Sequence, residues 1–550
     1  MKISAGLASD FYRPVLLIIF FILLASRRWE QLVSPQVWDE DGRDIIYGFI
    51  HYGWSEFLTP VNGYLITLPK MITALSLEVS FLYYPLVSTV LAWVFILLVG
   101  LAVALSPTKL KYKCLCALSI FVIPSDPEVF GLPQYTFWWV SLLLFLVILW
   151  DERRNDLCWR MFFLIIGGLS SPVIILISPI LYFRVYMYRQ YRAEVYLAFV
   201  ATVLAFIQLL FMIGNSAGQI PPLGSIVLNV VPTFFGMFLA GNMTEEFTWL
   251  WFLGTGLILL IAYSLIQDRY NITKWILIYL LIGTVALSVA RVDPVDIHTS
   301  LVGPRYFFFP FILIYWNLIQ IFEFSQTLKI RGILLAVITI ISTMNAVPAW
   351  SRQHTDLHWA AHVYSCVYFP QYIIPVHYDG RAYTTWSLRI NGETCSELLD
   401  DEWMYILSSE NKKPVYAYTR MEVSLPESVH DLDAGTPMII SSTIAGSDHE
   451  KTGMDGYNVT STFVTSDQDT GEMMLRLHRG DRLMYRSGPS DGGQSMIITE
   501  HEHEYIQELP IAENWTILEF SNISLPDEFF LKITDQGQGW GQWFSVAIKM

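Results

Sequence analysis

The sequence predicts a multi-pass α-helical membrane domain of about eleven transmembrane helices, followed by a C-terminal extracytoplasmic β-sandwich. Of 550 residues, 53% are hydrophobic and only 15% are charged, which is too apolar for an ordinary soluble protein. Residues 1–350 hold 21 Lys+Arg and 20 Asp+Glu, whereas residues 351–550 hold 13 and 29, so the two parts carry net charges of +1 and −16. This difference predicts two domains, and the acidic balance argues against nucleic-acid binding.

Long apolar runs predict where the spans lie, because a bilayer core needs roughly 20 apolar residues in a straight helix. The expected spans are near 14–26, 81–105, 114–123, 135–150, 194–213, 247–266, 275–290, 305–322 and 332–347. The run 161–183 is interrupted by two glycines and by Ser171-Pro172, so it is one kinked span or two short ones. The first run lacks a small-residue cleavage pattern, so we expect an uncleaved helix rather than a signal peptide.

The positions of Lys and Arg predict the orientation of the spans, because basic residues concentrate in short cytoplasmic loops. A cytoplasmic N-terminus and a helical pair at 161–183 give about eleven helices. This arrangement places these basic clusters on the cytoplasmic side: 109–113, 153–160, 184–192, 269–274 and 329–331. It leaves these segments on the outer side: 27–80, 126–128, 215–246, 291–304 and everything from about 350.

Beyond about residue 400, short alternating or apolar runs are separated by turn-forming residues, which is typical of β-strands. Candidate strands are 414–418, 438–442, 458–464, 473–478, 496–499, 516–520, 529–534 and 543–548. They predict a sandwich or jelly roll over 414–550, preceded by an extracytoplasmic juxtamembrane connector over 351–413. Cys366 and Cys395 in the connector either form a disulfide outside the cytoplasm or stay apart, and both alternatives remain open.

A dense acidic cluster follows the first span, with Asp39, Glu40, Asp41 and Asp44 within six residues. Carboxylates crowded near a low-dielectric surface repel one another, so at least one is expected to have a raised pKa and to be able to act as a general base. A solvated loop with a helix N-cap at Asp39 or Asp41 is the alternative. The broken apolar stretch 57–70 predicts a helix in the membrane interface, at the depth of the lipid headgroups.

Three further segments carry a resemblance together with this cluster. They are Asn62-Gly63-Tyr64-Leu65, the helix break 168–172, and Gly303-Pro304-Arg305-Tyr306-Phe307-Phe308. With them, roughly residues 10–350 resemble the GT-C glycosyltransferases and are similar to bacterial serotype-converting glucosyltransferases of O-antigen. The resemblance implies a GT-C-like catalytic domain over 1–350.

The same resemblance implies an activity and a location. A sugar, such as glucose, would pass from a polyprenyl-phosphate donor to a cell-envelope glycan such as O-antigen or lipopolysaccharide. The reaction would take place at the outer face of a bacterial cytoplasmic (inner) membrane, with the C-terminal domain in the periplasm. The implied partners are the lipid-linked donor, the glycan acceptor and the bilayer.

The resemblance further implies roles for the carboxylates. One carboxylate of the first outer loop would deprotonate the acceptor hydroxyl, and Asp39 and Asp41 are better candidates than Glu40 because similar families use aspartate there. Asp126 and Glu128 resemble a second acidic position of the family. The prolines beside them equally favour a turn with a helix cap.

A cation would stabilise the departing phosphate, on which negative charge builds during the reaction. Arg305 is the first candidate, beside Tyr306 at the outer start of a span, although an ordinary interfacial arginine would also be found there. Arg291 is the second candidate and Arg43 the third.

No metal ion or other cofactor is expected, because a polyprenyl-phosphate donor has no pyrophosphate leaving group to neutralise. His354, His358 and His362 would share one helical face, and two such residues can chelate zinc. The His-Glu-x-x-His signature is absent from the sequence, so structural packing or a role facing a substrate headgroup are the other interpretations.

Three other functions stay open. A lipid-linked sugar transporter or flippase would place charged residues within several spans, along a path. An O-antigen polymerase would depend on outer-loop arginines more than on a first-loop carboxylate. A non-catalytic glycan-binding anchor would need the C-terminal tail and not the first-loop acids, and the sequence shows no seam that fixes the oligomeric state.

Overall fold

The computed structural model describes these residues: 4–38, 40–154, 156–213, 221–321, 338–354, 357, 359–366, 372–378, 381–400, 438–441, 457–462, 471–478, 482–488, 494–500, 503–508, 516–519, 528–537 and 542–549. The chain divides into two compact units. Unit 1 comprises Met1–Val33, Phe57–Ile72 and Thr89–Gln353, and unit 2 comprises Ser34–Glu56, Thr73–Ser88 and His354–Met550. The first outer loop therefore belongs to the unit that also contains the C-terminal region.

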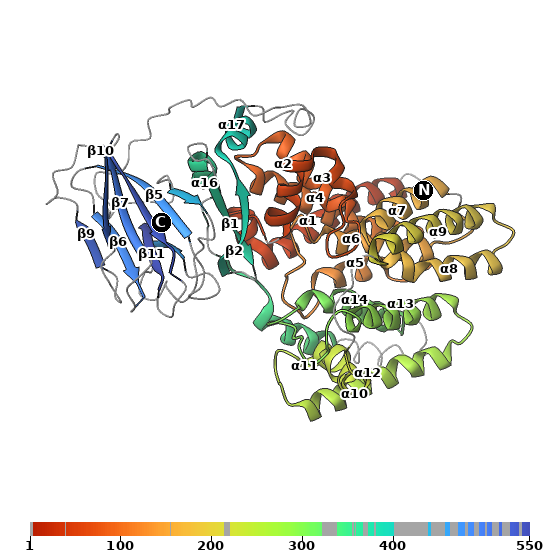
Figure 1. The fold of residues 1–550 in the computed structure, drawn as a ribbon. Helices are drawn as coiled ribbons and strands as arrows, with labels where there is room; N and C mark the ends of the chain where they lie inside the picture. Colours follow the sequence, from red (N-terminus) through yellow and green to blue (C-terminus); the bar gives the residue numbers. More distant parts are fainter. Residues whose placement is uncertain are drawn as a thin grey trace. The chain divides into compact units, whose positions relative to one another are not determined.

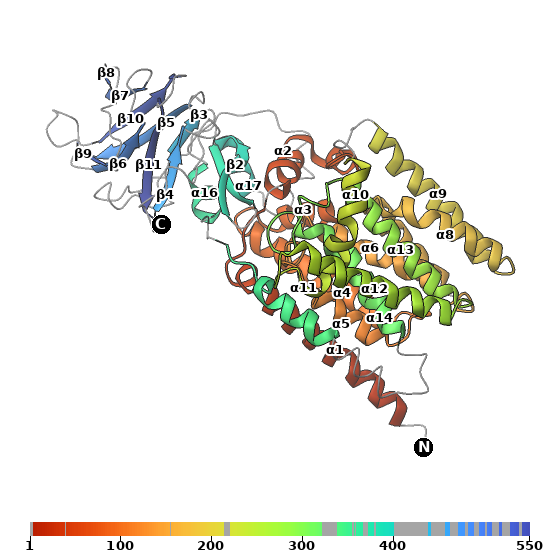
Figure 2. The ribbon, with the colours of Figure 1, turned by 90° about the horizontal axis from the view of Figure 1, so that it is seen from below.

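Unit 1 is helical (Figure 1). Its helices are α1 (Ser4–Val33), α5 (Lys113–Phe121), α6 (Thr136–Leu149), α7 (Leu157–Ser170), α8 (Val173–Met187), α9 (Arg192–Ile213), α10 (Leu223–Val230), α11 (Met237–Ala240), α12 (Phe247–Gln267), α13 (Ile272–Val289) and α14 (Phe308–Ile321). Two more, α3 (Thr67–Val79) and α4 (Tyr84–Leu105), lie partly in each unit. Neighbours in sequence pack side by side, as α8 and α9 do in both views (Figures 1 and 2).

Five helical segments in the described part of the chain are long and apolar enough to cross a membrane. They are Tyr84–Leu105, Arg192–Ile213, Leu223–Ala240, Phe247–Gln267 and Ile272–Val289. Four shorter apolar helices accompany them: Thr136–Leu149, Leu157–Ser170, Val173–Met187 and Ile338–Ala349. These lengths support a multi-pass membrane protein, but they do not confirm eleven spans.

The break within 161–183 separates two helices, as one of the two alternatives predicted. Helix α7 ends at Ser170 and α8 begins at Val173, after the helix-breaking Pro172. The Ser171 hydroxyl accepts a hydrogen bond from the Ser141 hydroxyl of α6 at 2.7 Å. The polar groups at the break are therefore bonded within the bundle.

Segment 215–246, expected as an outer loop, contains an apolar helical segment. Helix α10 continues through a π-helical turn (Val231–Gly236) into α11. Glycine permits a close crossing with α12, because a Cβ on Gly236 would lie 2.3 Å from the Leu250 carbonyl oxygen. The segment was missed because Gly224, Pro232 and Gly236 interrupt the apolar pattern.

This segment runs alongside the loop 291–304. Three side-chain hydrogen bonds join them: Ser225 to Asp293 at 2.6 Å, Thr233 to Pro294 at 3.0 Å, and Thr299 to Asn242 at 2.7 Å. The segment therefore contacts this loop near both of its ends and at its middle.

A buried ion triad joins α7, α8 and α9 of unit 1. Glu194 accepts hydrogen bonds from Arg160 at 2.8 and 3.1 Å and from Arg184 at 2.9 Å through each oxygen. The arginines also donate to the carbonyls of Val147 and Ile148 near the end of α6, where the helix leaves its last carbonyls without partners. Both arginines share one carboxylate, so they lie at the same end of the bundle.

The stretch 57–70 does not form the expected interface helix. The 3₁₀-helix Gly53–Leu58 ends there, and α3 begins only at Thr67. Between them, Asn62 and Gly63 have φ values of 51° and 87°, and the Val61 N–H donates to the Tyr64 carbonyl at 3.0 Å. Asn-Gly is a strong signal for such a turn. The prediction gave more weight to the apolar residues on either side of it, and so expected a helix.

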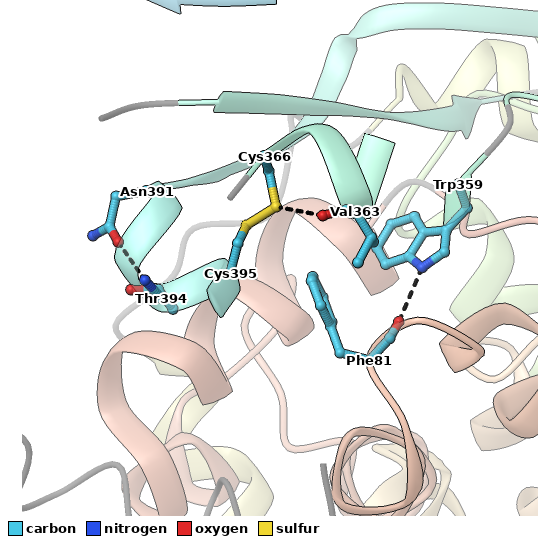
Figure 3. The surroundings of a disulfide bond; sticks show 7 residues. All are labelled: Phe81, Trp359, Val363, Cys366, Asn391, Thr394 and Cys395. Carbon is cyan, nitrogen blue, oxygen red and sulfur yellow. Dashed lines mark hydrogen bonds between the residues drawn. A yellow bond between two sulfur atoms is a disulfide. The ribbon is translucent and has the colours of Figure 1, made fainter. Parts of the chain in front are cut away.

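A helix-flanked hairpin in unit 2 follows the last apolar helix of unit 1. Strands β1 (Tyr372–Tyr378) and β2 (Arg381–Ile390) pair antiparallel between α16 (Trp359–Cys366) and α17 (Gly392–Asp400). Cys366 and Cys395 form a disulfide that joins the two helices (Figure 3). The Trp359 indole N–H donates to the Phe81 carbonyl at 3.1 Å, which ties α16 to the turn before α4.

The C-terminal residues of unit 2 form two antiparallel sheets, as expected for a sandwich. One has the order β3 (Met438–Ser441), β5 (Gly471–His478), β10 (Glu528–Asp535), β7 (Gln494–Glu500), β8 (His503–Glu508); the other has the order β4 (Tyr457–Ser461), β11 (Phe544–Lys549), β6 (Arg482–Ser487), β9 (Thr516–Glu519). Alternate residues such as Phe529, Leu531 and Ile533 are buried. The Thr462 hydroxyl donates to Asp535 at 2.6 Å and joins the sheets. The candidate strand 414–418 lies outside the described residues.

Candidate functional site

Glu128 and Arg305, both predicted as substrate-binding residues, are in direct contact in unit 1. The Glu128 carboxylate accepts from the Arg305 guanidinium at 2.5 Å and from its main-chain N–H at 3.0 Å. The Tyr135 hydroxyl donates to the same carboxylate at 3.0 Å. The Arg305 side chain remains 32% exposed beside these contacts.

Two further arginines lie beside the Asp126–Glu128 turn, and neither was predicted. Arg27, fully buried, donates to the Ser125 carbonyl, and its guanidinium lies 5.0 Å from the Phe130 ring centroid. Arg28, also fully buried, donates to the Phe130 carbonyl at 3.2 Å. The turn between α5 and α6 is therefore built against the end of α1.

Arg352 completes this group, which we call the arginine cluster: Arg27, Arg28, Arg305 and Arg352 around Asp126 and Glu128. The Arg352 guanidinium lies 3.4 Å from the Asp126 carboxylate. The Asp126 N–H donates to the Thr299 carbonyl, so the cluster borders the loop 291–304. Four cations and two carboxylates give these six side chains a formal charge of +2, which suits an anionic ligand.

Within the arginine cluster, the pKa values of Asp126 and Glu128 are shifted in opposite directions. Burial raises the pKa of Asp126 above its ordinary value, and the charge of Arg352 offsets this only in part. Burial acts on Glu128 in the same direction. However, the charges of Arg305 and Arg352 and the hydrogen bond from Tyr135 outweigh it and hold the pKa of Glu128 below its ordinary value. Glu128 is thus the permanent anion that orients Arg305.

The first outer loop is held against the β1–β2 hairpin within unit 2. The His377 N–H donates to the Val37 carbonyl at 2.8 Å, and the Trp38 ring contacts the His377 ring at 5.5 Å between centroids. The Asp41 N–H donates to the Trp38 carbonyl at 2.9 Å at the start of the π-helical segment Asp41–Ile46. Asp41 is only 1% exposed, so its carboxylate has a fixed position.

Gly42 lies close to the hairpin, where no side chain larger than hydrogen fits without a shift. A Cβ at this position would lie 2.5 Å from the Val376 Cγ1 atom. We expect Gly42→Ala to displace the neighbouring carboxylates and to lower the activity proposed below by about a hundredfold, as roughly 1 Å of misplacement does. Val376→Ala in the same chain should restore it. Rates are compared with those of Gly256→Ala, since a Cβ there meets nothing within 4 Å. Equal rates for Gly42→Ala and Gly256→Ala would contradict the positioning role.

The remaining first-loop candidates differ in their surroundings. Asp39 lies outside the described residues. Glu40 is half-buried and directly precedes the π-helical segment, without a side-chain capping bond. Arg43 forms two hydrogen bonds with Asp44, at 3.0 and 2.9 Å, so its charge is neutralised by its neighbour. Both side chains of this pair are exposed, at 38% and 39%, and neither is part of the arginine cluster.

The two remaining candidates, Arg291 and Tyr306, take part in different arginine–tyrosine contacts of unit 1. Arg291 donates to the Asn62 carbonyl at 3.3 Å, and its guanidinium lies 5.6 Å from the centroid of the Tyr64 ring. The Arg305 guanidinium lies 5.4 Å from the Tyr306 ring centroid. Tyr64 of the segment 62–65 therefore lies beside Arg291, and Tyr306 of the segment 303–308 lies beside Arg305. Both segments are part of the sequence resemblance.

The described histidines of the 354–362 series do not lie together on one helix. Helix α16 begins at Trp359, so His354 precedes it, while His362 lies within it; His358 lies outside the described residues. The His354 ring instead contacts the His377 ring at 5.4 Å between centroids. Within the described ranges, no group of three or more His, Cys, Asp or Glu side chains is arranged to hold a metal ion.

The comparisons with solved structures include a weak likeness to a membrane transferase. No protein-family model and no curated protein matches the chain. The solved structure of arabinosyltransferase EmbB from Mycobacterium smegmatis aligns with a TM-score of 0.31 and 10% identity, over 97% of this chain and 64% of that one. The chain thus spans less than two thirds of the length of that protein.

Proposed function

We propose that the protein is a membrane glycosyltransferase that moves a sugar, such as glucose, from a polyprenyl-phosphate donor to a cell-envelope glycan such as O-antigen or lipopolysaccharide. The reaction would take place at the outer face of a bacterial cytoplasmic membrane, with unit 2 on the periplasmic side. The arginine cluster carries the proposal, because it gathers four guanidiniums beside the loop 291–304 of an apolar helical unit.

The charge of the cluster fits the leaving group. A polyprenyl-phosphate sugar is a phosphodiester with one negative charge, and the departing polyprenyl phosphate gains a second. A surplus of two positive charges therefore favours the products and the transition state over the bound donor. Arg305 would contact the phosphate, while Glu128 and Tyr135 fix its guanidinium.

The chemical step needs a base and no metal ion. A first-loop carboxylate, Asp41 or Asp39, would take the proton of the acceptor hydroxyl as its oxygen attacks the anomeric carbon. The bond between that carbon and the phosphate oxygen breaks, and its electron pair leaves with the polyprenyl phosphate. A monophosphate leaving group is stabilised by arginine alone in this scheme.

The test is sugar transfer by the full chain in liposomes supplied with radiolabelled polyprenyl-phosphate glucose and an acceptor glycan. Arg305→Ala is expected to lower kcat/KM by about 10²- to 10³-fold, the usual effect of removing a preorganised donor. The control is Arg189→Ala, since Arg189 is an exposed cation at the other, basic end of the bundle.

Two outcomes would contradict the proposal. Equal losses in Arg305→Ala and Arg189→Ala would remove the phosphate role from the cluster. Absence of transfer by the intact chain with a panel of donor sugars would instead favour a lipid-linked sugar transporter, which a donor-flipping assay in the same liposomes would detect.

A further inference from the structure

An apolar groove lies between α8 and α13, away from the arginine cluster. Its volume is about 340 Å³, and its walls include Pro179 and Phe183 of α8 and Ile272, Trp275, Ile276 and Tyr279 of α13. These side chains are aliphatic, aromatic or proline, so the groove presents almost no hydrogen-bonding groups to water.

The shape of the groove follows from how the two helices touch. A Cβ on Gly283 would lie 2.3 Å from the Leu176 Cδ1 atom, so the helices are in direct contact at that level. The Tyr279 hydroxyl donates to the Leu176 carbonyl at 3.0 Å and closes the groove there. From Tyr279 to Ile272 the groove extends along seven residues, or about 10 Å, towards the basic end of the bundle.

The groove opens on an exposed, apolar face of the bundle. Helix α13 is one of the segments long and apolar enough to cross a membrane. Phe183 is 47% exposed and Trp275 is 50% exposed. An apolar groove at this depth is filled by hydrocarbon, because water has no polar partner in it.

The mouth of the groove carries cationic charge. The Trp275 indole N–H donates to the Arg269 carbonyl at 2.8 Å, so the groove wall contacts the turn before α13. The Arg269 guanidinium is exposed and lies 4.9 Å from the Tyr270 ring centroid. Arg189, also exposed, follows α8 at the same end. Basic residues and aromatic rings at this level are those that meet anionic lipid headgroups.

We propose that this groove is a binding site for an anionic phospholipid of the leaflet at the basic end of the bundle. One acyl chain lies in the groove against Phe183 and Trp275, and the headgroup phosphate lies at Arg269. The site is separate from the proposed donor site, so its occupancy is measurable without sugar transfer.

The test is native mass spectrometry of the full chain released from nanodiscs that contain phosphatidylglycerol and phosphatidylcholine. The intact chain is expected to retain one phosphatidylglycerol. Ile272→Trp, which fills the groove, should lower the retained fraction about tenfold, whereas Ile282→Trp on the lipid-exposed face of the same helix should not. Arg269→Gln should abolish the preference for phosphatidylglycerol over phosphatidylcholine while the chain remains folded.

Three results would overturn the proposal. They are equal retention by Ile272→Trp and Ile282→Trp, a retained mass that corresponds to polyprenyl phosphate rather than phospholipid, and a second copy of the chain bound in place of lipid. The Arg269→Gln arm changes only an exposed side chain, so it decides the headgroup contact even if Ile272→Trp fails to fold.

Discussion

Replacing Asp41 by asparagine is expected to lower the rate of sugar transfer by about 10²- to 10⁴-fold, the range that a positioned general base contributes. Asparagine has the size of aspartate but cannot accept the proton of the acceptor hydroxyl. Asp41 is buried beside Gly42, which the hairpin contacts, so its carboxylate has a fixed place from which to act. The measurement is the initial transfer rate in the liposome assay, together with equilibrium binding of the labelled donor, which should be unchanged.

The control for this substitution is Glu245→Gln, which neutralises an exposed carboxylate in the turn before α12. Asp39→Asn and Glu40→Gln are measured in parallel, since the other two first-loop acids are competing candidates. Full transfer by Asp41→Asn would reject Asp41 as the base. Full transfer by all three variants would remove the base from the first loop altogether.

Replacing Glu194 by alanine is expected to destabilise the membrane-embedded unit by about 3–5 kcal/mol, because it leaves two buried guanidiniums without their carboxylate. The side chains of Arg160, Arg184 and Glu194 are at most 2% exposed. Their hydrogen bonds connect four helices, so the loss is not confined to one element. The measurement is the midpoint of unfolding in detergent.

Glu245→Ala, at an exposed site, is the matched control and should leave the midpoint unchanged. Replacing all three triad residues by apolar ones of similar volume should recover much of the loss, because no buried charge then remains. A midpoint for Glu194→Ala equal to that of Glu245→Ala would show that the triad contributes nothing.

Local sequence patterns predicted much of the fold. Pro172 predicted a break between α7 and α8, and strand alternation predicted β10 at 529–534, where the structure has Glu528–Asp535. The hairpin β1–β2 was missed because Pro375 interrupts β1, where the structure has a register shift. Strand β6 was missed because arginine and methionine blur its alternation.

The site was less predictable, because its contacts join distant parts of the chain. Glu128 and Arg305 were both candidates, but their pairing across 177 positions has no local signal. Arg27 and Arg28 directly follow the first apolar run in the sequence and were not among the predicted site residues. Their burial depends on the turn 123–130, about a hundred residues later in the chain. The local signal that could have identified them is the pair of adjacent arginines at the expected outer end of a span.

The bond between Val37 and His377 has a consequence for biogenesis. The acidic loop leaves the ribosome early, but the strand that holds it is made 340 positions later. At about 5–20 residues per second, the loop waits roughly 20–70 s before its partner exists. During that interval it has neither the hairpin contact nor the neighbouring disulfide. The first outer loop should therefore remain open to proteases and chaperones until about two thirds of the chain has been made, and nascent chains shorter than about 380 residues should lack an ordered acidic loop.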